Sequence, residues 1–497
     1  MVNLSAFIRY HAARTPDRVA YVYGGRPTTY SGFYQRIAGL AAHLRARGVG
    51  PGTIVAALMK NSAAFIDLSF AVSHLGAVFL PINYRLAGDE VDYILNHAGA
   101  GIVVADREFG PLLDSASDPI LLEPAQQADT ALLGGDANIV AEPEPQGPDD
   151  LFRLVYTSGT TDRPKGVEHR YSNFYWKTMD HVMALGLSAD DRLLVVGPLY
   201  HVGAYDLPGI AVLWAGGMLS VQRDFDAADA LSAIERDRLT GGWMAPTMLN
   251  DILSSDAAGR HDLDSIKWVI GGGERTPESR IRAFGETFRR GRYIDAYGLT
   301  ESCSGDTMME AGREFEKIGS TGPALAHVAI RIADDDGRAF GPGEDGEICL
   351  RGPKITSGYW RDAEKTAASF FAGGWFRTGD VGHLDGDGFL YLTDRKKDMI
   401  LSGGENIASS EVERVLYDLA VVHEAAAIGL PDDKWGETVT AVIVTRPGTS
   451  LTLDQVQAHC RAHLAGFKVP RRLVLQTELP RNPSGKVLKR ALREALT

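Results

Sequence analysis

The stretch Tyr156-Thr-Ser-Gly-Thr-Thr-Asp-Arg-Pro-Lys-Gly166 brings hydroxyl side chains, two glycines and a single lysine together in one short segment. Hydroxyl groups and the backbone N–H groups that glycine exposes can donate hydrogen bonds to an anion, and a lysine adds positive charge. The residues just before it, Phe152 to Tyr156, are mostly apolar, as is typical of a short buried strand. The pattern therefore predicts a strand that leads into a phosphate-binding loop.

The spacing within this stretch excludes the nucleotide-binding P-loop. A P-loop needs a glycine, four further residues and then Gly-Lys-Ser/Thr. Here Gly159 is followed after four residues by Pro164-Lys165-Gly166. A polar surface turn is the usual explanation for a shorter Ser/Thr/Gly/Pro cluster, but it accounts poorly for the whole ordered stretch.

The composition limits the class of protein. With 497 residues, 44% of them hydrophobic and 23% charged, the chain is long enough for roughly two to four folding units. Its net charge of −13 argues against a general nucleic-acid-binding protein, which needs a surplus of Lys and Arg. The three cysteines, Cys303, Cys349 and Cys460, are far apart, which favours reduced thiols in the cytoplasm over disulfides or a zinc site.

The two segments that could act as an export signal or a membrane span are both too short in apolar residues. The segment from Met1 to Arg9 has no apolar core of signal-peptide length. The most apolar later run, Leu207 to Val221, is interrupted by one proline and three glycines and falls short of the roughly 18 to 20 residues that a membrane span needs. We therefore expect no transmembrane segment.

Strands and helices alternate over the first part of the chain. We expect a helix from an N-cap at Ser31 and, after it, the strands 53–59, 78–81 and 102–105 with the helices 62–75 and 89–97 between them. Such alternation predicts an α/β fold with a mostly parallel sheet covered by helices on both faces. After Gly319, short strands and Gly/Asp turns predict a β-rich subdomain.

The last part of the chain has the pattern of a separate, small α+β unit. Ser410 and Glu413 have the spacing of a capping box at the start of a helix. Strands are expected at 425–428, 438–444 and 473–475, with another helix beginning at Thr452.

Six further short motifs combine residues that can bind a nucleotide or catalyse a reaction. Each has an ordinary structural explanation when it is taken alone: a hydrogen-bonded histidine at a strand end, a tight glycine turn, a hairpin aspartate, a solvated linker or a lysine in a tail. The motifs are Tyr200-His201, Gly271-Gly-Gly273, Tyr297-Gly-Leu-Thr-Glu301, Trp375-Phe-Arg-Thr-Gly-Asp380, Tyr391-Leu-Thr-Asp-Arg-Lys-Lys397 followed by Ser402-Gly-Gly-Glu-Asn406, and Pro480-Arg-Asn-Pro-Ser-Gly-Lys486.

Taken in this order with the opening stretch, the motifs resemble those of the adenylate-forming superfamily, which includes acyl-CoA synthetases, firefly-type luciferases and peptide-synthetase adenylation domains. The resemblance covers the whole chain. One position departs from the family pattern: Asp162 stands where the family normally has glycine, which adds negative charge to a loop expected to bind phosphates.

The resemblance implies a role for the residues of the catalytic motifs. Lys486 would be the catalytic lysine of adenylate formation, and His201 would lie beside the acyl carboxylate. Thr300 would contact the α-phosphate and Glu301 would hold Mg²⁺. Lys397 would be the hinge of a mobile C-terminal domain, which gives domains at 1–396 (AMP-binding) and 397–497 (mobile).

The resemblance also implies how the nucleotide and CoA bind. Tyr297 would stack on adenine, Asp380 would accept both ribose hydroxyls, and Arg395 would touch the ribose or a phosphate. The other residues implied in binding ATP or CoA are Thr157, Ser158, Gly159, Thr160, Thr161, Lys165, Gly272, Gly273, Gly403 and Gly404. For the acyl pocket, family position suggests Tyr205, Trp243, Met244, Gly272, Gly273, Gly298, Ser302, Cys303 and Ser304, each of which could equally be a core residue.

The function implied by the resemblance is an AMP-forming carboxylate–CoA ligase that uses ATP, Mg²⁺ and CoA. The segments 76–86 and 402–406 look most like those of fatty-acyl and aryl-CoA synthetases, so a fatty acid is the expected substrate and an aryl or cinnamic-type acid the alternative. Two other functions stay open: an amino-acid-activating enzyme, for which Asp206 is the only nearby acid, and a nucleotide-binding protein without turnover. The expected partners are small molecules, with a homodimer possible and no nucleic acid.

Overall fold

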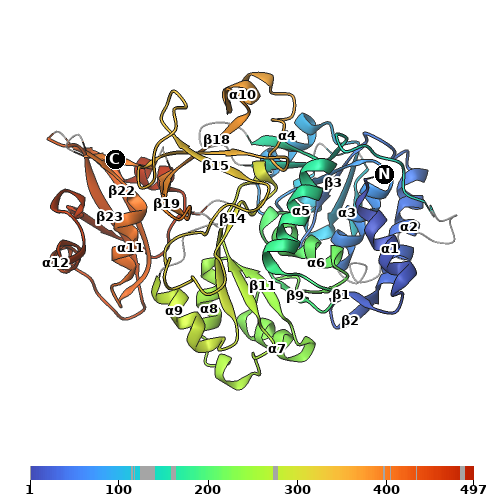
Figure 1. The fold of residues 1–497 in the computed structure, drawn as a ribbon, viewed down its shortest axis with the longest axis horizontal. Helices are drawn as coiled ribbons and strands as arrows, with labels where there is room; N and C mark the ends of the chain where they lie inside the picture. The colour runs from blue at the N-terminus through green and yellow to red at the C-terminus, as the bar shows by residue number, and fades with distance from the viewer. Residues whose placement is uncertain are drawn as a thin grey trace.

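Two mostly parallel sheets form the larger, N-terminal part of the chain (Figure 1). The computed structural model describes residues 2–113, 116, 118–123, 140, 142–157, 164–272, 278–395, 398–402, 405–432, 434–481 and 487–497. The first sheet is six-stranded, and all its neighbours are parallel except the final β7–β8 pair. Its order is β6 (Ile120–Leu122), β5 (Ile102–Asp106), β3 (Ile54–Leu58), β4 (Val78–Pro81), β7 (Leu151–Thr157) and β8 (Lys165–Arg170).

The second sheet is eight-stranded and parallel in its centre, with an antiparallel strand at each edge. Its order is β14 (Thr307–Met308), β13 (Arg292–Tyr297), β12 (Trp268–Gly271), β11 (Gly241–Met244), β9 (Arg192–Val195), β10 (Met218–Val221), β1 (Val19–Tyr23) and β2 (Arg26–Thr29). The expected α/β fold is thus confirmed, with two such sheets in place of one.

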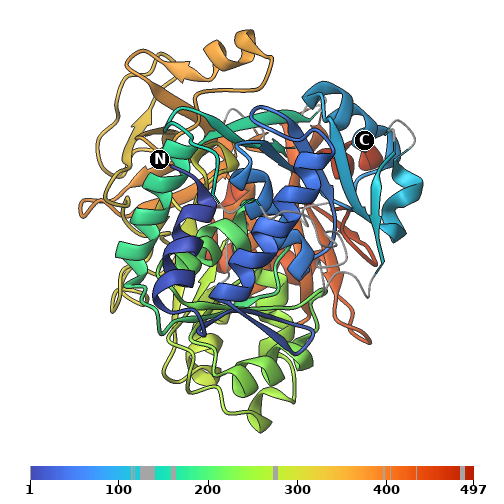
Figure 2. The ribbon, with the colours of Figure 1, turned by 90° about the vertical axis from the view of Figure 1, so that its right-hand side faces the viewer.

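Helices cover both sheets, and one helix is buried between them. Every residue of α3 (Ala63–His74) is buried, because the core cluster around it draws side chains from strands of both sheets. The helices α1 (Leu4–Arg14) and α2 (Tyr30–Ala46) pack against α3 and form the end of the molecule seen in front in Figure 2. The other helices of this part are α4 (Gly88–Ala98), α5 (Tyr171–Leu185), α6 (Ile210–Trp214), α7 (Ala227–Asp237), α8 (Pro246–Leu253) and α9 (Glu278–Thr287).

The β-rich subdomain and the C-terminal unit follow as two further sheets. The first contains β15 (Ala329–Ala333), β16 (Gly346–Arg351), β17 (Phe370–Phe371), β18 (Trp375–Leu384) and β19 (Leu390–Arg395), all paired antiparallel, with α10 (Ala363–Ala368) beside it. The second contains β20 (Ile400–Ser402), β21 (Glu405–Ile407), β22 (Val422–Asp432), β23 (Gly436–Thr445) and β24 (Arg472–Leu475), with α11 (Ser409–Tyr417), α12 (Leu453–His463) and α13 (Lys489–Leu496). In Figure 1 this last unit, coloured orange to red, lies at the opposite end from α1.

Two predicted helix caps are wrong. The N-cap of α2 is Thr29, whose hydroxyl accepts from Gly32 N at 3.1 Å, because strand β2 runs directly into the helix. At α11 the N-cap is Ala408, without a side-chain cap. Ser410 donates instead to the carbonyl of Thr393, so tertiary contacts use the side chain that the local pattern assigned to the cap.

None of the helices in the described ranges combines the length and the apolar character that a membrane span requires. The apolar run 207–221 divides into the end of a π-helical segment η4 (Val202–Gly209), the short α6 and strand β10.

Candidate active site

The hairpin β7–β8 holds the two ends of the expected phosphate loop. Thr157 pairs with Lys165 across the hairpin, and the Lys165 ammonium lies over the ring of Tyr359, 5.2 Å from its centroid. Ser158, Gly159, Thr160, Thr161 and Asp162, which make up most of the loop, lie outside the described residues.

Glu301 lies beside this lysine. The Tyr359 hydroxyl donates to Glu301 Oε1 at 2.9 Å, and the backbone N–H of Thr356 donates to the Glu301 carbonyl at 2.7 Å. Burial raises the pKa of Glu301, although Tyr359 and Lys165 act in the opposite direction. The structure thus brings Lys165 and Glu301 together through Tyr359, a residue that the sequence analysis missed; the adjacent aromatic pair Tyr359-Trp360 was its only signal.

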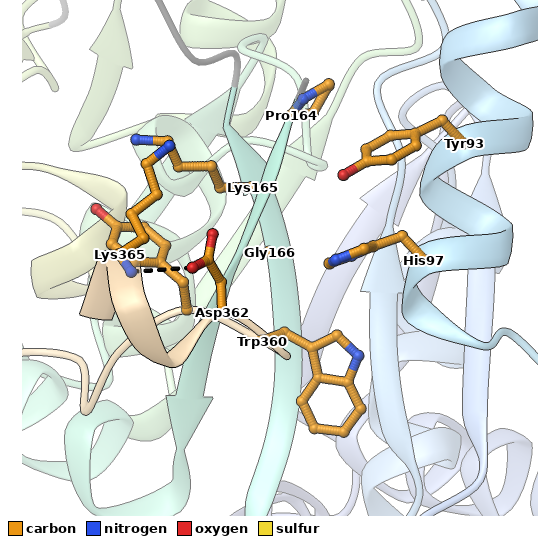
Figure 3. Close-up of a pocket in the computed structure, with 9 residues that line it drawn as sticks. Tyr93, His97, Pro164, Lys165, Gly166, Trp360, Asp362 and Lys365 are labelled. Atoms are coloured by element: carbon orange, nitrogen blue, oxygen red, sulfur yellow. Dashed lines mark hydrogen bonds between the residues drawn. The ribbon is translucent and has the colours of Figure 1, made fainter. Parts of the chain in front are cut away.

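A cavity of about 480 Å³ opens next to Lys165 (Figure 3). Tyr93 and His97 of α4 face the hairpin across it, and His97 Nδ1 is 2.7 Å from the hydroxyl of Tyr156. The residues that line it are Tyr93, His97, Pro164, Lys165, Gly166, Tyr359, Trp360, Asp362 and Lys365.

The residues expected to bind adenosine are also close together. The Tyr297 hydroxyl donates to Asp380 Oδ2 at 2.8 Å, and both side chains are buried. Asp380 of β18 stands opposite Arg395 of β19 in the sheet register. The side chain of Arg395 lies outside the described part of the structure, as do Gly273, Lys397, Gly403, Gly404 and Lys486.

His201 caps η4. Its Nδ1 accepts from the backbone N–H of Gly203 at 3.1 Å, so a neutral ring carries its proton on Nε2, the nitrogen that can donate to an anion. The preceding Tyr200 is buried and packs edge-on against Tyr84. A π-helical segment is rare and often occurs at functional sites.

The indole of Trp243 fills much of the space in the region expected to hold the acyl group. A Cβ atom at Gly203 would lie 2.8 Å from Cζ2 of this indole, and one at Gly197 would lie 2.7 Å from Cε3. At Gly272 it would lie 3.4 Å from the indole Nε1. The glycines therefore leave the space that the indole fills, and only the smallest residue fits at Gly197 and Gly203.

The turn after Glu301 has an unusual backbone. Cys303 and Ser304 have φ values of +56° and +74°, which non-glycine residues rarely adopt. Lys354 holds this turn from inside: its ammonium donates to the Ser304 carbonyl at 3.0 Å and lies 3.0 Å from a carboxylate oxygen of Asp306. Gly298 is required nearby, since a Cβ there would lie 2.2 Å from the backbone nitrogen of Gly305.

Asp206 does not face the site as a substrate ligand. Its carboxylate forms a two-pronged ion pair with Arg153, with distances of 2.9 Å for Nη1–Oδ1 and 2.7 Å for Nη2–Oδ2, and both side chains are buried. Gly203, two residues after His201, is not an acid, and the indole of Trp243 fills the space beside it. The geometry therefore disfavours recognition of a substrate ammonium group.

The Glu301 carboxylate fits a divalent cation that is also bound by oxygens of a ligand. Glu301 offers a partly buried carboxylate whose pKa is raised by burial, and a nearby cation would relieve that cost. Among the residues that the structure describes, no group of three or more His, Cys, Asp or Glu side chains could hold a metal by itself. A Mg²⁺ ion held by one carboxylate, phosphate oxygens and water is the arrangement this element commonly adopts.

Comparisons with known proteins identify the family of this chain. Residues 8–360 match the model of the AMP-binding enzyme family, and residues 411–486 match the AMP-binding enzyme C-terminal domain. The chain is 37% identical to a feruloyl-CoA synthase from an Amycolatopsis species, over 97% of this chain and 96% of that protein. It is 34% identical to the long-chain-fatty-acid–CoA ligase FadD13 of Mycobacterium tuberculosis, over 99% and 98%.

Among solved structures, the chain is similar to ATP-bound MatB from Rhodopseudomonas palustris. The TM-score is 0.92 and the identity 29%, with 99% of each chain covered. The chain therefore belongs to the AMP-binding enzyme family, the adenylate-forming superfamily, and is an AMP-forming acid–CoA ligase.

Proposed function

We propose that this ligase activates a carboxylic acid with a compact, planar acyl group of the aryl or cinnamic type. The observation that carries the proposal is the position of Trp243, whose indole lies against Gly197, Gly203 and Gly272. Trp243 and Gly272 are among the residues expected to form the acyl pocket. A large flat side chain there would offer an aromatic ring a surface to stack on and would shorten the space for a long chain.

The similarity to a feruloyl-CoA synthase supports this substrate class. A fatty acid, the substrate expected from the sequence, is the second candidate, and the similarity to FadD13 favours it. The two candidates differ in whether the Trp243 indole is a wall of the pocket or a side chain that moves away when an acyl chain enters.

In the proposed first step, an oxygen of the substrate carboxylate attacks the α-phosphorus of ATP, the bond to the bridging oxygen breaks, and pyrophosphate leaves. The reaction brings two anions together, so donors and positive charge must stabilise the transition state. We assign this role to Thr300, to Lys486 and to the loop donors Thr157 to Thr161. Lys165 would orient the pyrophosphate, for which the adjacent cavity of about 480 Å³ offers room.

We assign binding of the adenosine part to Tyr297, Asp380, Arg395, Gly272 and Gly273. The hydrogen bond between Tyr297 and Asp380 supports this assignment, because it places the aromatic ring and the ribose acceptor next to each other. Mg²⁺ bound at Glu301 would neutralise phosphate charge.

In the second step, the CoA thiol loses its proton and its sulfur attacks the acyl carbonyl, and AMP leaves. His201 would lie beside the reacting carboxyl group. We propose that Lys397 is the hinge between domains 1–396 and 397–497, and that Gly403 and Gly404 line the passage for the pantetheine arm. The three cysteines are buried thiols that form no disulfide, which supports the proposal that the enzyme works in a reducing compartment such as the cytoplasm.

A panel of acids tests the substrate class. Acid-dependent pyrophosphate exchange should give a higher kcat/KM for ferulic and cinnamic acids than for saturated acids of eight to sixteen carbons. In Trp243→Ala, we expect the ratio of the two kcat/KM values to shift toward the long chains by about 10- to 100-fold. Trp268→Ala, which removes a buried indole at the start of β12, is the control and should leave the ratio unchanged. A wild-type preference for the long chains would overturn the aryl proposal and leave the fatty-acid candidate.

A further inference from the structure

A chain of buried polar side chains lies behind the Thr300 turn. The Arg153 guanidinium contacts the Asp206 carboxylate at one end and His169 Nδ1 at the other, through Nη2 at 2.9 Å and Nε at 3.2 Å. His169 Nε2 is 2.7 Å from the carbonyl oxygen of Thr300. This relay, Asp206–Arg153–His169–Thr300, thus connects η4, β7 and β8 to the motif Tyr297–Glu301.

The partners fix the protonation of His169. Arg153 has only donors, so Nδ1 must accept, and the carbonyl of Thr300 can only accept, so Nε2 must donate. The ring is therefore neutral, with its proton on Nε2. Burial, and then the positive charge of Arg153, lower the pKa of His169 to about 3, which agrees with this tautomer.

The relay fixes one of two neighbouring carbonyl groups in the motif. His169 donates to the carbonyl of Thr300, while the backbone N–H of Thr356 donates to that of Glu301. The two residues therefore have anchors from different parts of the chain, one from β8 and one from the segment before Tyr359. A turn held in this way can keep its side chains in one position.

We propose that His169, backed by Arg153 and Asp206, is a positioning residue that holds Thr300 against the α-phosphate of the nucleotide. The proposal rests on the proposed role of Thr300. A buried ion pair is a costly way to fill a core, since apolar side chains of similar volume often give equal or greater stability. The Arg153–Asp206 ion pair orients His169, and His169 orients the carbonyl group of Thr300. This function would explain why an ion pair is buried here although apolar side chains could be equally stable.

Two substitutions separate the two hydrogen bonds of the ring. Asparagine at 169 can place its oxygen near the position of Nδ1 and accept from Arg153, but its side chain is too short to reach Thr300. Glutamine can place its amide nitrogen near the position of Nε2 and donate to Thr300. His74→Asn is the matched control, because His74 is also fully buried and bridges a hydroxyl, Ser5 Oγ, and a carbonyl, Val140 O, each at 2.8 Å.

The readout is the affinity for AMP compared with adenosine, measured by titration calorimetry. Adenosine lacks the phosphate, so the ratio of the two dissociation constants isolates the phosphate contact. In His169→Asn we expect AMP binding to weaken by about tenfold or more with adenosine binding unchanged, because small displacements of a positioning group are costly. His169→Gln should retain most of the AMP affinity, and His74→Asn should leave the ratio at the wild-type value.

Equal weakening of AMP and adenosine in His169→Asn, or an unchanged ratio, would overturn the proposal. If His169→Asn does not fold, Arg153→Lys gives the same test, because a lysine can pair with Asp206 while losing the donors to Nδ1; the ratio of its AMP dissociation constant to its adenosine dissociation constant should rise by about threefold. A wild-type protein that binds AMP no more tightly than adenosine would overturn both this proposal and the role of Thr300. The acyl substrate does not enter this measurement. The positioning role of His169 and the proposed substrate class can therefore fail independently of each other.

Discussion

Asp206 and Glu301 are two carboxylates near the Thr300 turn whose environments differ. Burial would raise the pKa of Asp206, but Arg153 and then Lys177 lower it, and the net shift is downward. Burial raises the pKa of Glu301, and there the opposing contributions of Tyr359 and Lys165 are too small to reverse the shift. The protein supplies a full counter-charge to the first carboxylate, whereas the second gains from a cation that arrives with the nucleotide.

The largest expected effect comes from breaking the compensated pair. Asp206→Asn leaves the Arg153 guanidinium buried without its counter-charge, and we expect the free energy of unfolding to fall by about 3 to 5 kcal/mol. Urea unfolding followed by circular dichroism measures it. In the double variant Arg153→Met/Asp206→Leu, most of the loss should be recovered. A loss as large in the double variant as in the single one would mean that packing, and not charge, dominates at this position.

The second largest expected effect is a pH dependence of the unfolding free energy that is caused by His169. Its pKa in the folded state, about 3, is below the ordinary value near 6.5, so the stability it contributes is present above pH 6.5 and is lost as the pH falls toward 3. Between pH 7.5 and pH 5, the difference in unfolding free energy between the wild type and His169→Gln should narrow by about 2 kcal/mol. A constant difference over this range would show that the folded protein protonates the ring as readily as the unfolded chain does, contrary to the lowered pKa.

The smallest effect is expected at Lys177, which is fully buried and donates from Nζ to the carbonyl of Asp206 at 2.6 Å. Burial lowers its pKa to about 8. Lys177→Met removes a desolvated charge and one hydrogen bond, two changes of opposite sign, so the unfolding free energy at pH 7 should change by less than about 1 kcal/mol.

The same variant, Lys177→Met, also tests the direction of the pKa shift of Lys177 at alkaline pH. The folded pKa of Lys177 lies below the unfolded value near 10.4, so the wild type should gain stability relative to Lys177→Met as the pH rises from 8 to 9, by about 1 kcal/mol. Thermal unfolding at the two pH values measures this difference. A relative loss over that interval would show that Lys177 is better stabilised as a cation in the folded state than its burial suggests.

Short motifs in the sequence predicted the α/β fold, and they also singled out the residues that we propose to contact the ligands. Lys165, Glu301, Tyr297 and Asp380 each lie in a compact pattern, and the structure places them in two adjoining pairs, Lys165 with Glu301 through Tyr359, and Tyr297 with Asp380. Local patterns suffice for such residues because the chemistry needs particular side chains at fixed spacing.

The buried relay could not be predicted in this way. Arg153, His169, Asp206 and Thr300 come from β7, β8, η4 and the segment after β13, and only tertiary packing brings them together. The one local signal was a charged residue, Arg153, in an otherwise apolar strand. The wrong capping-box prediction at Ser410 has the same origin, since a contact distant in sequence determines where a polar side chain points.

The most direct test of the contrast between the two carboxylates is the Mg²⁺ dependence of acid-dependent pyrophosphate exchange in Glu301→Gln. The glutamine keeps the size and the oxygen that accepts from Tyr359 but cannot supply the negative charge that Glu301 would offer a cation. We predict that the Mg²⁺ concentration for half-maximal exchange rises by about tenfold or more, while the unfolding free energy does not fall, because a carboxylate with a raised pKa is replaced by a neutral group. An unchanged Mg²⁺ requirement, or a loss of stability like that expected for Asp206→Asn, would contradict the account.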